Sequence, residues 1–261
     1  MIRTLVSIEV DLASSLAIRY ACRLGNLIPM ELQPVYVKGY PFEEPFTGIG
    51  WVRHTWEKEL VKEGKEEINE MIAAEMDTCP VLQEPRVIFG DREKELSHLM
   101  EAETFDLYIE GAPYPFNPVT IAKRLHVKFY QHLNCPFVWL RTLRPINKVL
   151  ILCLEPTGTA ALGQALKKVW AGCQVPLHVG MPSGATPALQ EAVANLEVSL
   201  TKADCLTTLE PGLSLPPADL PAAARLDFGL VALALPRTLK KDHHLLPWLT
   251  QIKIPLMVVL T

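Results

Sequence analysis

The sequence has 261 residues, of which 49% are hydrophobic and 21% are charged, and its formal net charge is −4. This composition excludes an intrinsically disordered chain and predicts a globular protein with a sizeable core. The negative charge disfavours a surface for nucleic acid or anionic membranes, because both need concentrated basic residues. The length favours one large domain or two of ordinary size.

Neither the apolar runs nor the cysteines point to a membrane or secreted protein. No apolar run approaches the roughly 18 to 20 residues that span a bilayer, and residues 1–6 alternate like a strand rather than a signal peptide. The six cysteines are spread singly, without a Cys-x-x-Cys pair. We therefore expect a cytoplasmic protein without membrane contact, whose cysteines are reduced and mostly buried.

Hydrophobic periodicity predicts alternating strands and helices along the first part of the chain. Expected strands cover residues 4–10, 32–37, 85–89, 107–109 and 137–140, and expected helices cover residues 17–28, 55–76, 92–103 and 119–133. The helix at 55–76 carries Glu and Lys at spacings of three and four residues, which indicates a solvated face.

The same order of elements then begins again. Expected strands cover residues 147–152, 177–179 and 206–209, and expected helices cover residues 159–170, 187–202 and, as a short Ala-rich helix, 221–226. Charged residues are much sparser after residue 145, so we expect the second half to bury a larger part of its surface.

Three fragments match between the halves: residues 34–37 with 176–179, residues 107–113 with 230–236, and residues 136–142 with 255–261. Such an internal repeat predicts two tandem domains, residues 1–144 and residues 145–261, which meet near Pro145.

Each predicted domain is a Rossmann-like α/β unit, a doubly wound and mostly parallel five-stranded sheet with helices on both faces. Each half ends on an apolar strand, and an uncovered apolar edge invites aggregation. We expect the two terminal strands to pair and form a pseudo-twofold dimer within one chain.

Two segments carry a family resemblance. Residues 8–14 (IEVDLAS) place the acid Asp11 after the first strand, and residues 134–138 (NCPFV) place Cys-Pro before the last strand of the half. The chain resembles a tandem universal stress protein with a more divergent second half. The resemblance implies a stress-response or regulatory role and, in ATP-binding members, a Gly-x-x-Gly motif after the fourth strand with a later Gly-Ser or Gly-Thr pair.

The glycines of that motif let the backbone approach phosphate closely. Here Gly111 keeps the first position, but Tyr114 stands at the second and Arg124 at the later pair. We expect ATP binding in the family's manner to be lost, with Tyr114 and Phe116 filling the first-half crevice.

The second half departs further from the family motif. Ala234 and Arg237 replace its two glycines, and Glu155 replaces the first-strand acid. The first half is therefore the better host for a ligand.

One alternative stays open for that first half: a nucleotide (ATP, ADP or AMP) or another small anion held through Asp11, Val37 and Gly111. Asp11 either caps the following helix or accepts a hydrogen bond from an adenine or ribose. Lys123 and Arg124 either contact an anion or are solvated helix residues.

We predict no catalytic residues and no metal site. His243 and His244 are adjacent, whereas helical metal ligands sit three or four residues apart, so they indicate a polar helix start. No Gly-x-Ser-x-Gly elbow is present, and Ser14 and Ser15 are typical of a helix cap. An enzyme related to adenine-nucleotide α-hydrolases would share the fold, but no catalytic set is recognisable. The aromatic segment at 42–56 either packs or forms a lid, and we favour packing.

We therefore expect a non-catalytic regulatory protein that acts through contacts with an unidentified protein and needs no cofactor. A homodimer is an alternative assembly, and the nucleotide-binding sensor is the alternative function.

Overall fold

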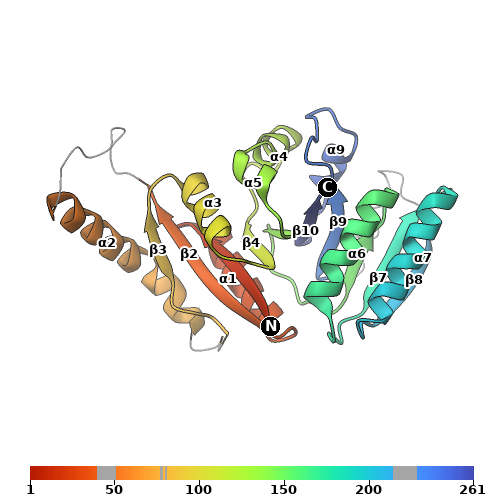
Figure 1. Ribbon diagram of the computed structural model, residues 1–261, viewed down its shortest axis with the longest axis horizontal. Helices are drawn as coiled ribbons and strands as arrows, with labels where there is room; N and C mark the ends of the chain where they lie inside the picture. The colour runs from red at the N-terminus through yellow and green to blue at the C-terminus, as the bar shows by residue number, and fades with distance from the viewer. Residues whose placement is uncertain (40–50, 77–78, 80, 214–227) are drawn as a thin grey trace.

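The computed structural model describes residues 1–39, 51–76, 79, 81–213 and 228–261. In the first half, strands and helices alternate as the periodicity predicts (Figure 1). They are β1 (Ile2–Ile8), α1 (Leu12–Gly25), β2 (Met30–Lys38), α2 (Trp51–Met76), β3 (Arg86–Phe89), α3 (Arg92–Ala102), β4 (Leu107–Gly111), α4 (Pro118–Leu125), α5 (Lys128–His132) and β5 (Phe137–Leu140).

The second half repeats the order, and its elements are β6 (Val149–Leu152), α6 (Pro156–Trp170), β7 (Leu177–Pro182), α7 (Pro187–Thr201), β8 (Thr207–Leu213), β9 (Leu230–Leu235), α9 (Leu245–Leu249) and β10 (Leu256–Leu260). The expected helix at residues 221–226 lies outside the described residues.

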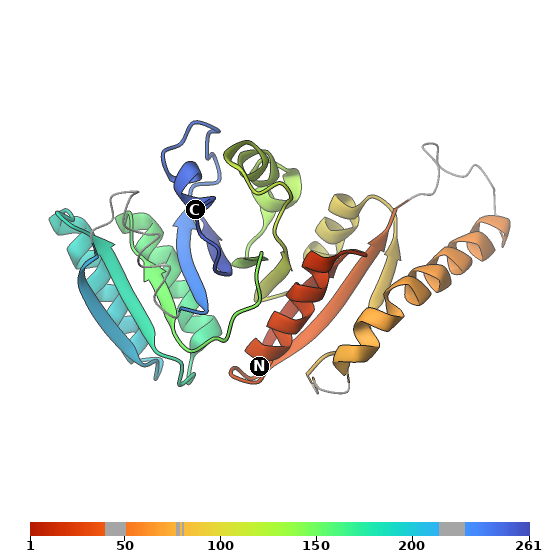
Figure 2. The same ribbon diagram turned by 180° about the vertical axis from the view of Figure 1, so that it is seen from behind.

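All ten strands join one sheet, in the order β3-β2-β1-β4-β5-β10-β9-β6-β7-β8. The only antiparallel neighbours in this order are β5 and β10 at its centre, where Val138 lies opposite Met257. The other neighbours pair in parallel. The predicted pairing of the two terminal strands is confirmed, and it merges the two five-stranded halves into a pseudo-twofold arrangement (Figure 2).

Two apolar cores lie on opposite faces of this sheet. Residues of α1, α2, α6 and α7 pack on one face, with Trp170 fully buried there. Residues of α3, α4, α5 and α9 pack on the other, with Trp139 and Trp248 at its centre. Both faces are covered, as a mostly parallel sheet requires.

The helix expected over residues 119–133 is two helices, α4 and α5. The backbone amide of His126 donates to the Ala122 carbonyl, which lies 2.7 Å from Nδ1 of the same histidine. Val127 then turns to an extended conformation and becomes the N-cap of α5. The break was not visible in the sequence because both helices bury apolar residues on the same core.

Reciprocal arginine contacts hold the halves together beside the central strands. Arg237, which follows β9, donates to the carbonyls of Tyr130, Gln131 and Leu133 at the end of α5. Arg141, which follows β5, donates in turn to carbonyls at the end of α9. Each half therefore satisfies carbonyls at a helix end of the other.

The expectation that all six cysteines are reduced is wrong for two of them. Cys22 of α1 and Cys79 form a disulfide across 57 residues, with Cα atoms 5.5 Å apart. The other four are free, and three of these are buried. The pair was missed because sequence spacing gives no information on which distant cysteines meet.

Candidate functional site

A cavity of about 490 Å³ lies in the first half, beyond the carboxyl ends of β1 and β4. Crevices at this end of parallel strands are where α/β proteins place ligands. Its walls come from the starts of α1 and α3, the turn after β4, and α4. The lining residues are Ser7, Glu9, Asp11, Ala13, Ser14, Arg92, Glu93, Gly111, Ala112, Pro113, Tyr114, Thr120, Lys123, Arg124 and Val127.

Asp11 lies at the cavity wall and caps α1. Its Oδ1 accepts a hydrogen bond from the Ser14 amide at 2.7 Å. The Ser14 hydroxyl is buried and accepts from the Glu9 amide at 2.8 Å, so it closes the turn rather than capping the helix. One oxygen of the Asp11 carboxylate therefore serves as the helix cap.

Gly111 lies where β4 meets the start of α1. A Cβ at this position would stand 2.6 Å from the Cβ of Ala13, closer than side chains approach one another. The second half has the corresponding contact, but there the glycine is on the helix and the alanine is on the strand. A Cβ on Gly158 of α6 would stand 2.9 Å from the Cβ of Ala234 of β9. Each glycine therefore has a structural role, because only a residue without a side chain lets the helix and the strand pack this closely.

Val37 does not join the other two predicted site residues. It lies on β2, in register with Ile88 of β3, and its side chain is buried in the core beside Leu96. Asp11 and Gly111 both line the cavity, whereas Val37 is not among its lining residues.

A buried carboxylate beside the crevice, bonded to two of its lining residues, was missed by sequence reasoning. Glu110 of β4 is 1% exposed. Its Oε2 lies 2.7 Å from Arg92 and 3.1 Å from Arg124, and it accepts from the Tyr108 hydroxyl at 2.8 Å. Its Oε1 accepts from the Trp139 indole at 2.8 Å. An acid inside an otherwise apolar strand was the available signal.

Charge and hydrogen bonding keep Glu110 ionised. Burial alone raises the pKa of this carboxyl, but the guanidinium groups of Arg92 and Arg124 outweigh burial and hold the pKa below its ordinary value. Glu110 and Glu9 likewise outweigh the effect of burial on Arg92 and raise its pKa. The two arginines that face the cavity are therefore committed to carboxylates of the protein itself.

The start of α4 also offers few free backbone amides to an anion. Asn117 is its N-cap, and the Asn117 Oδ1 accepts from the Thr120 amide at 2.9 Å. Pro118 at the first position of the helix has no amide hydrogen to donate. The amides that would receive a phosphate at a helix start are thus reduced in number and partly used.

The expectation that Tyr114 and Phe116 fill the crevice is wrong. Tyr114 is 96% exposed and stands at the rim. Phe116 packs away from the cavity, edge-to-face against Trp139 and under the guanidinium of Arg141 at 4.4 Å. Neither side chain therefore fills the crevice.

No protein-family model and no curated protein matches the sequence. Among solved structures, a universal stress protein from Archaeoglobus fulgidus matches with a TM-score of 0.64 at 14% identity, over 98% of this chain and 95% of that one. The chain has the universal stress protein fold.

Two full-length matches from Pseudomonas aeruginosa support this fold. A universal stress protein described as putative gives a TM-score of 0.54 at 16% identity, covering 99% of this chain and 92% of that one. A protein described as functionally unknown gives 0.57 at 14% identity, with the same coverage. The tandem form of the universal stress protein fold is thus shared along the whole chain.

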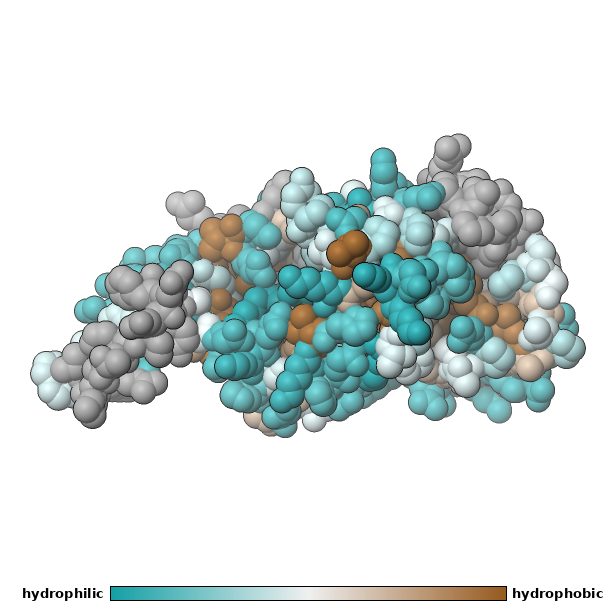
Figure 3. Space-filling view, turned by 90° about the horizontal axis from the view of Figure 1, so that it is seen from above, coloured by the Kyte–Doolittle hydropathy of each residue, from teal (hydrophilic) through white to brown (hydrophobic). Residues whose placement is uncertain are grey.

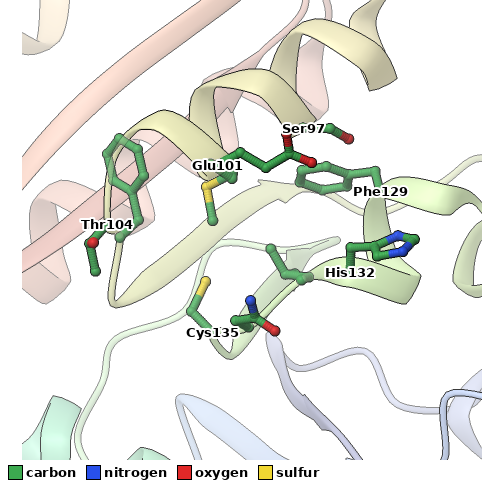
Figure 4. A pocket seen from close by; sticks show the side chains of 10 residues that line it. Ser97, Glu101, Thr104, Phe129, His132 and Cys135 are labelled. Carbon is green, nitrogen blue, oxygen red and sulfur yellow. The ribbon is translucent and has the colours of Figure 1, made fainter.

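A second cavity, of about 260 Å³, lies between α3 and α5 (Figure 4). Its polar groups do not form a catalytic set. The Ser97 hydroxyl donates to the Glu93 carbonyl, and Nδ1 of His132 lies 2.8 Å from the Lys128 carbonyl. Burial raises the pKa of the Cys135 thiol to about 12, so this cysteine is not a thiolate near neutral pH.

The structure leaves the other site expectations as predictions. Within the described ranges, no three His, Cys, Asp or Glu residues gather as metal ligands, and no helix suited to span a bilayer is found. His244 is the N-cap residue of α9, as a polar helix start predicts. In the aromatic segment, Trp56 packs edge-to-face on Phe89, Trp51 is exposed, and Phe42 and Phe46 lie outside the described residues.

Proposed function

We propose that this protein is a non-catalytic regulatory protein of the universal stress type, which acts through contacts with another protein and does not bind ATP in the family's manner. The observation that supports this is the charge balance of the crevice. The lining carries three cationic side chains, on Arg92, Lys123 and Arg124, and three carboxylates, on Glu9, Asp11 and Glu93. Arg92 and Arg124 also pair with the buried Glu110, which is not a lining residue, so little positive charge is left for a triphosphate.

A cytoplasmic stress response fits this role, and no cofactor, metal or nucleic acid is needed for it. A protein with a fold shared by many functions works through its particular surface. The first-half crevice then has a structural task, because Asp11, Ser14 and Gly111 fix the start of α1 on the sheet.

Thermal denaturation of nucleotide-stripped protein tests this proposal. A ligand that binds only the native state must raise its apparent stability. We expect ATP, ADP and AMP at millimolar concentration to leave the melting temperature unchanged. A concentration-dependent rise with ATP would contradict the proposal.

The second candidate function is a sensor of a nucleotide or small anion that lacks a triphosphate. It is favoured by the open cavity and by Lys123, which is exposed and has no ion pair among the described residues. AMP that raises the melting temperature of the wild type but not of a Lys123→Ala variant would support this candidate. A flat response to AMP in both proteins would dismiss it.

A further inference from the structure

A groove lies across the junction of the two halves, next to the crevice, with which it shares Lys123 and Val127. Its volume is about 660 Å³. One wall is α4 and the residues that follow it, and the other is the segment before α9. Figure 1 shows α4 and α9 side by side at the top of the molecule, where they are in contact. The lining residues are Val119, Ala122, Lys123, His126, Val127, Lys240, Lys241 and Asp242.

The floor of this groove is apolar although α4 is already anchored. Ile121 and Leu125 of the same helix are fully buried in the core. Val119, by contrast, is 65% exposed and lines the groove with Ala122 and Val127. Seen from above, apolar surface appears as separate brown patches among hydrophilic side chains (Figure 3). An apolar strip in such surroundings is a feature of contact surfaces.

The rim of the groove is basic in a chain that is acidic as a whole. Lys123, Lys240 and Lys241 are exposed, and none of them has an ion pair within the described part of the chain. Asp242 is the single acid among the lining residues. Three lysines against one aspartate contrast with the net charge of −4, so this rim attracts an acidic partner.

Because the groove is open to solvent, it fits a partner helix better than it fits a small molecule. Binding sites for small molecules enclose most of the ligand surface, which an exposed floor such as Val119 does not do. An amphipathic helix needs only one buried face, with anchors three and four residues apart. The eight residues of α4 extend over about 12 Å at 1.5 Å per residue, which matches two to three turns of a partner helix.

Nucleic acid and lipid fit these observations less well. No Phe, Tyr or Trp lines the groove, and His126 is the single ring among its lining residues, so successive bases would lack a stacking platform. Three lysines on an acidic protein supply little of the counterion release on which nucleic-acid binding depends. An anionic membrane presents a broad charged surface, whereas the chain as a whole carries a net charge of −4 and its basic residues here are three lysines.

We propose that this groove binds an acidic amphipathic helix of a partner protein. The inference rests on the proposed contact role and specifies its surface. The groove takes walls from both halves, so it exists only because β5 pairs with β10 in one chain. Its partner is recognised by an apolar stripe that covers Val119 and by carboxylates that reach Lys240 and Lys241.

A designed peptide serves as the probe. It is fluorescein-labelled, about 16 residues long, with Leu three and four residues apart on one helical face and Glu elsewhere. Its matched control carries Lys in place of Glu. Fluorescence anisotropy with the full-length protein at low salt is expected to give saturable binding of the acidic peptide and none of the basic one.

Three protein variants locate the binding. We expect the double variant Lys240→Glu/Lys241→Glu to weaken binding of the acidic peptide roughly tenfold or more. We expect the same of the separate variant Val119→Asp. All three residues are exposed, so the fold should be retained. Lys58→Glu/Lys65→Glu on α2 makes the same charge change at exposed lysines that have no ion pair with any described residue, and it should leave binding intact.

Several outcomes would overturn the proposal. One is equal weakening by the α2 variant, and another is equal binding of the basic peptide. The others are preference for single-stranded DNA or anionic vesicles, and self-association through the groove. If neither peptide nor nucleotide binds, the groove is rejected while a contact role elsewhere stands. If both the peptide and ATP bind, the groove is supported and the proposed loss of ATP binding fails.

Discussion

Arg92 of α3, which lines the crevice, forms an ion pair with the buried Glu110 of β4, with 2.7 Å between the Arg92 Nη2 and the Glu110 Oε2. The Glu110 side chain is 2% exposed, and Arg124 approaches the same oxygen at 3.1 Å. This carboxylate forms ion pairs with both guanidinium groups, which would otherwise be free to bind an anion. Under the proposed function, this pairing, rather than the bulk of Tyr114 or Phe116, opposes a triphosphate.

Replacing Glu110 with Gln should destabilise the protein. The change leaves Arg92 and Arg124 without a buried counter-charge, and breaking a buried pair on one side costs about 3 to 5 kcal/mol. Urea denaturation measures the loss in the free energy of unfolding. Glu101→Gln, at an exposed acid on α3, is the control and should change little. A loss for Glu110→Gln no larger than the control's would contradict the assigned role of the pair.

The same pair predicts how stability depends on pH. The folded protein holds the pKa of Glu110 below the ordinary value of 4.5, so its contribution is present above that pH and is lost as the pH falls through the folded pKa. The difference in unfolding free energy between the wild type and Glu110→Gln should therefore shrink below about pH 4.5. A difference that stays constant down to about pH 3 would count against a lowered pKa.

Gly111→Ala tests whether this glycine serves packing rather than a ligand. The added methyl group meets Ala13 at 2.6 Å, and the backbone carbonyl carbon of Ala13 is only 3.1 Å away. We expect a loss of about 1 to 3 kcal/mol, typical of overpacking. Gly39→Ala is the matched control, because no atom lies within 4 Å of its added Cβ. If both variants unfold at the same urea concentration, the packing account is wrong.

Arg237→Ala should loosen the junction between the halves. Arg237 donates three hydrogen bonds to carbonyls near the end of α5, and a hydrogen bond from a charged group contributes about 1.5 to 3 kcal/mol. The free energy of unfolding should fall by at least that much. Arg237→Lys should restore only part of it, since an ammonium lacks the planar fork. Full recovery with lysine would show that charge alone holds this contact.

Local patterns predicted much of this fold. The matching fragments at residues 136–142 and 255–261 led to the pairing of β5 with β10, because two apolar terminal strands need cover. The cap formed by Asp11 was equally accessible, since its hydrogen bond spans three residues. Both features depend on neighbours in the chain or on a repeat within it.

The crevice network could not be predicted in this way. The partners of Glu110 come from α3, β4, the end of α4 and β5, and no spacing along the chain brings them together. The outward position of Tyr114 and the disulfide between Cys22 and Cys79 likewise depend on tertiary placement. Sequence reasoning found the departure from the glycine motif, but its expectation that Tyr114 and Phe116 fill the crevice was wrong.

Calorimetric titration of nucleotide-free protein with ATP tests the central claim most directly. The charges around Glu110 predict that the wild type shows no saturable heat of binding up to millimolar ATP. One-to-one binding with a micromolar dissociation constant, lost on charge reversal by Lys123→Glu, would contradict the claim and place a nucleotide in the crevice.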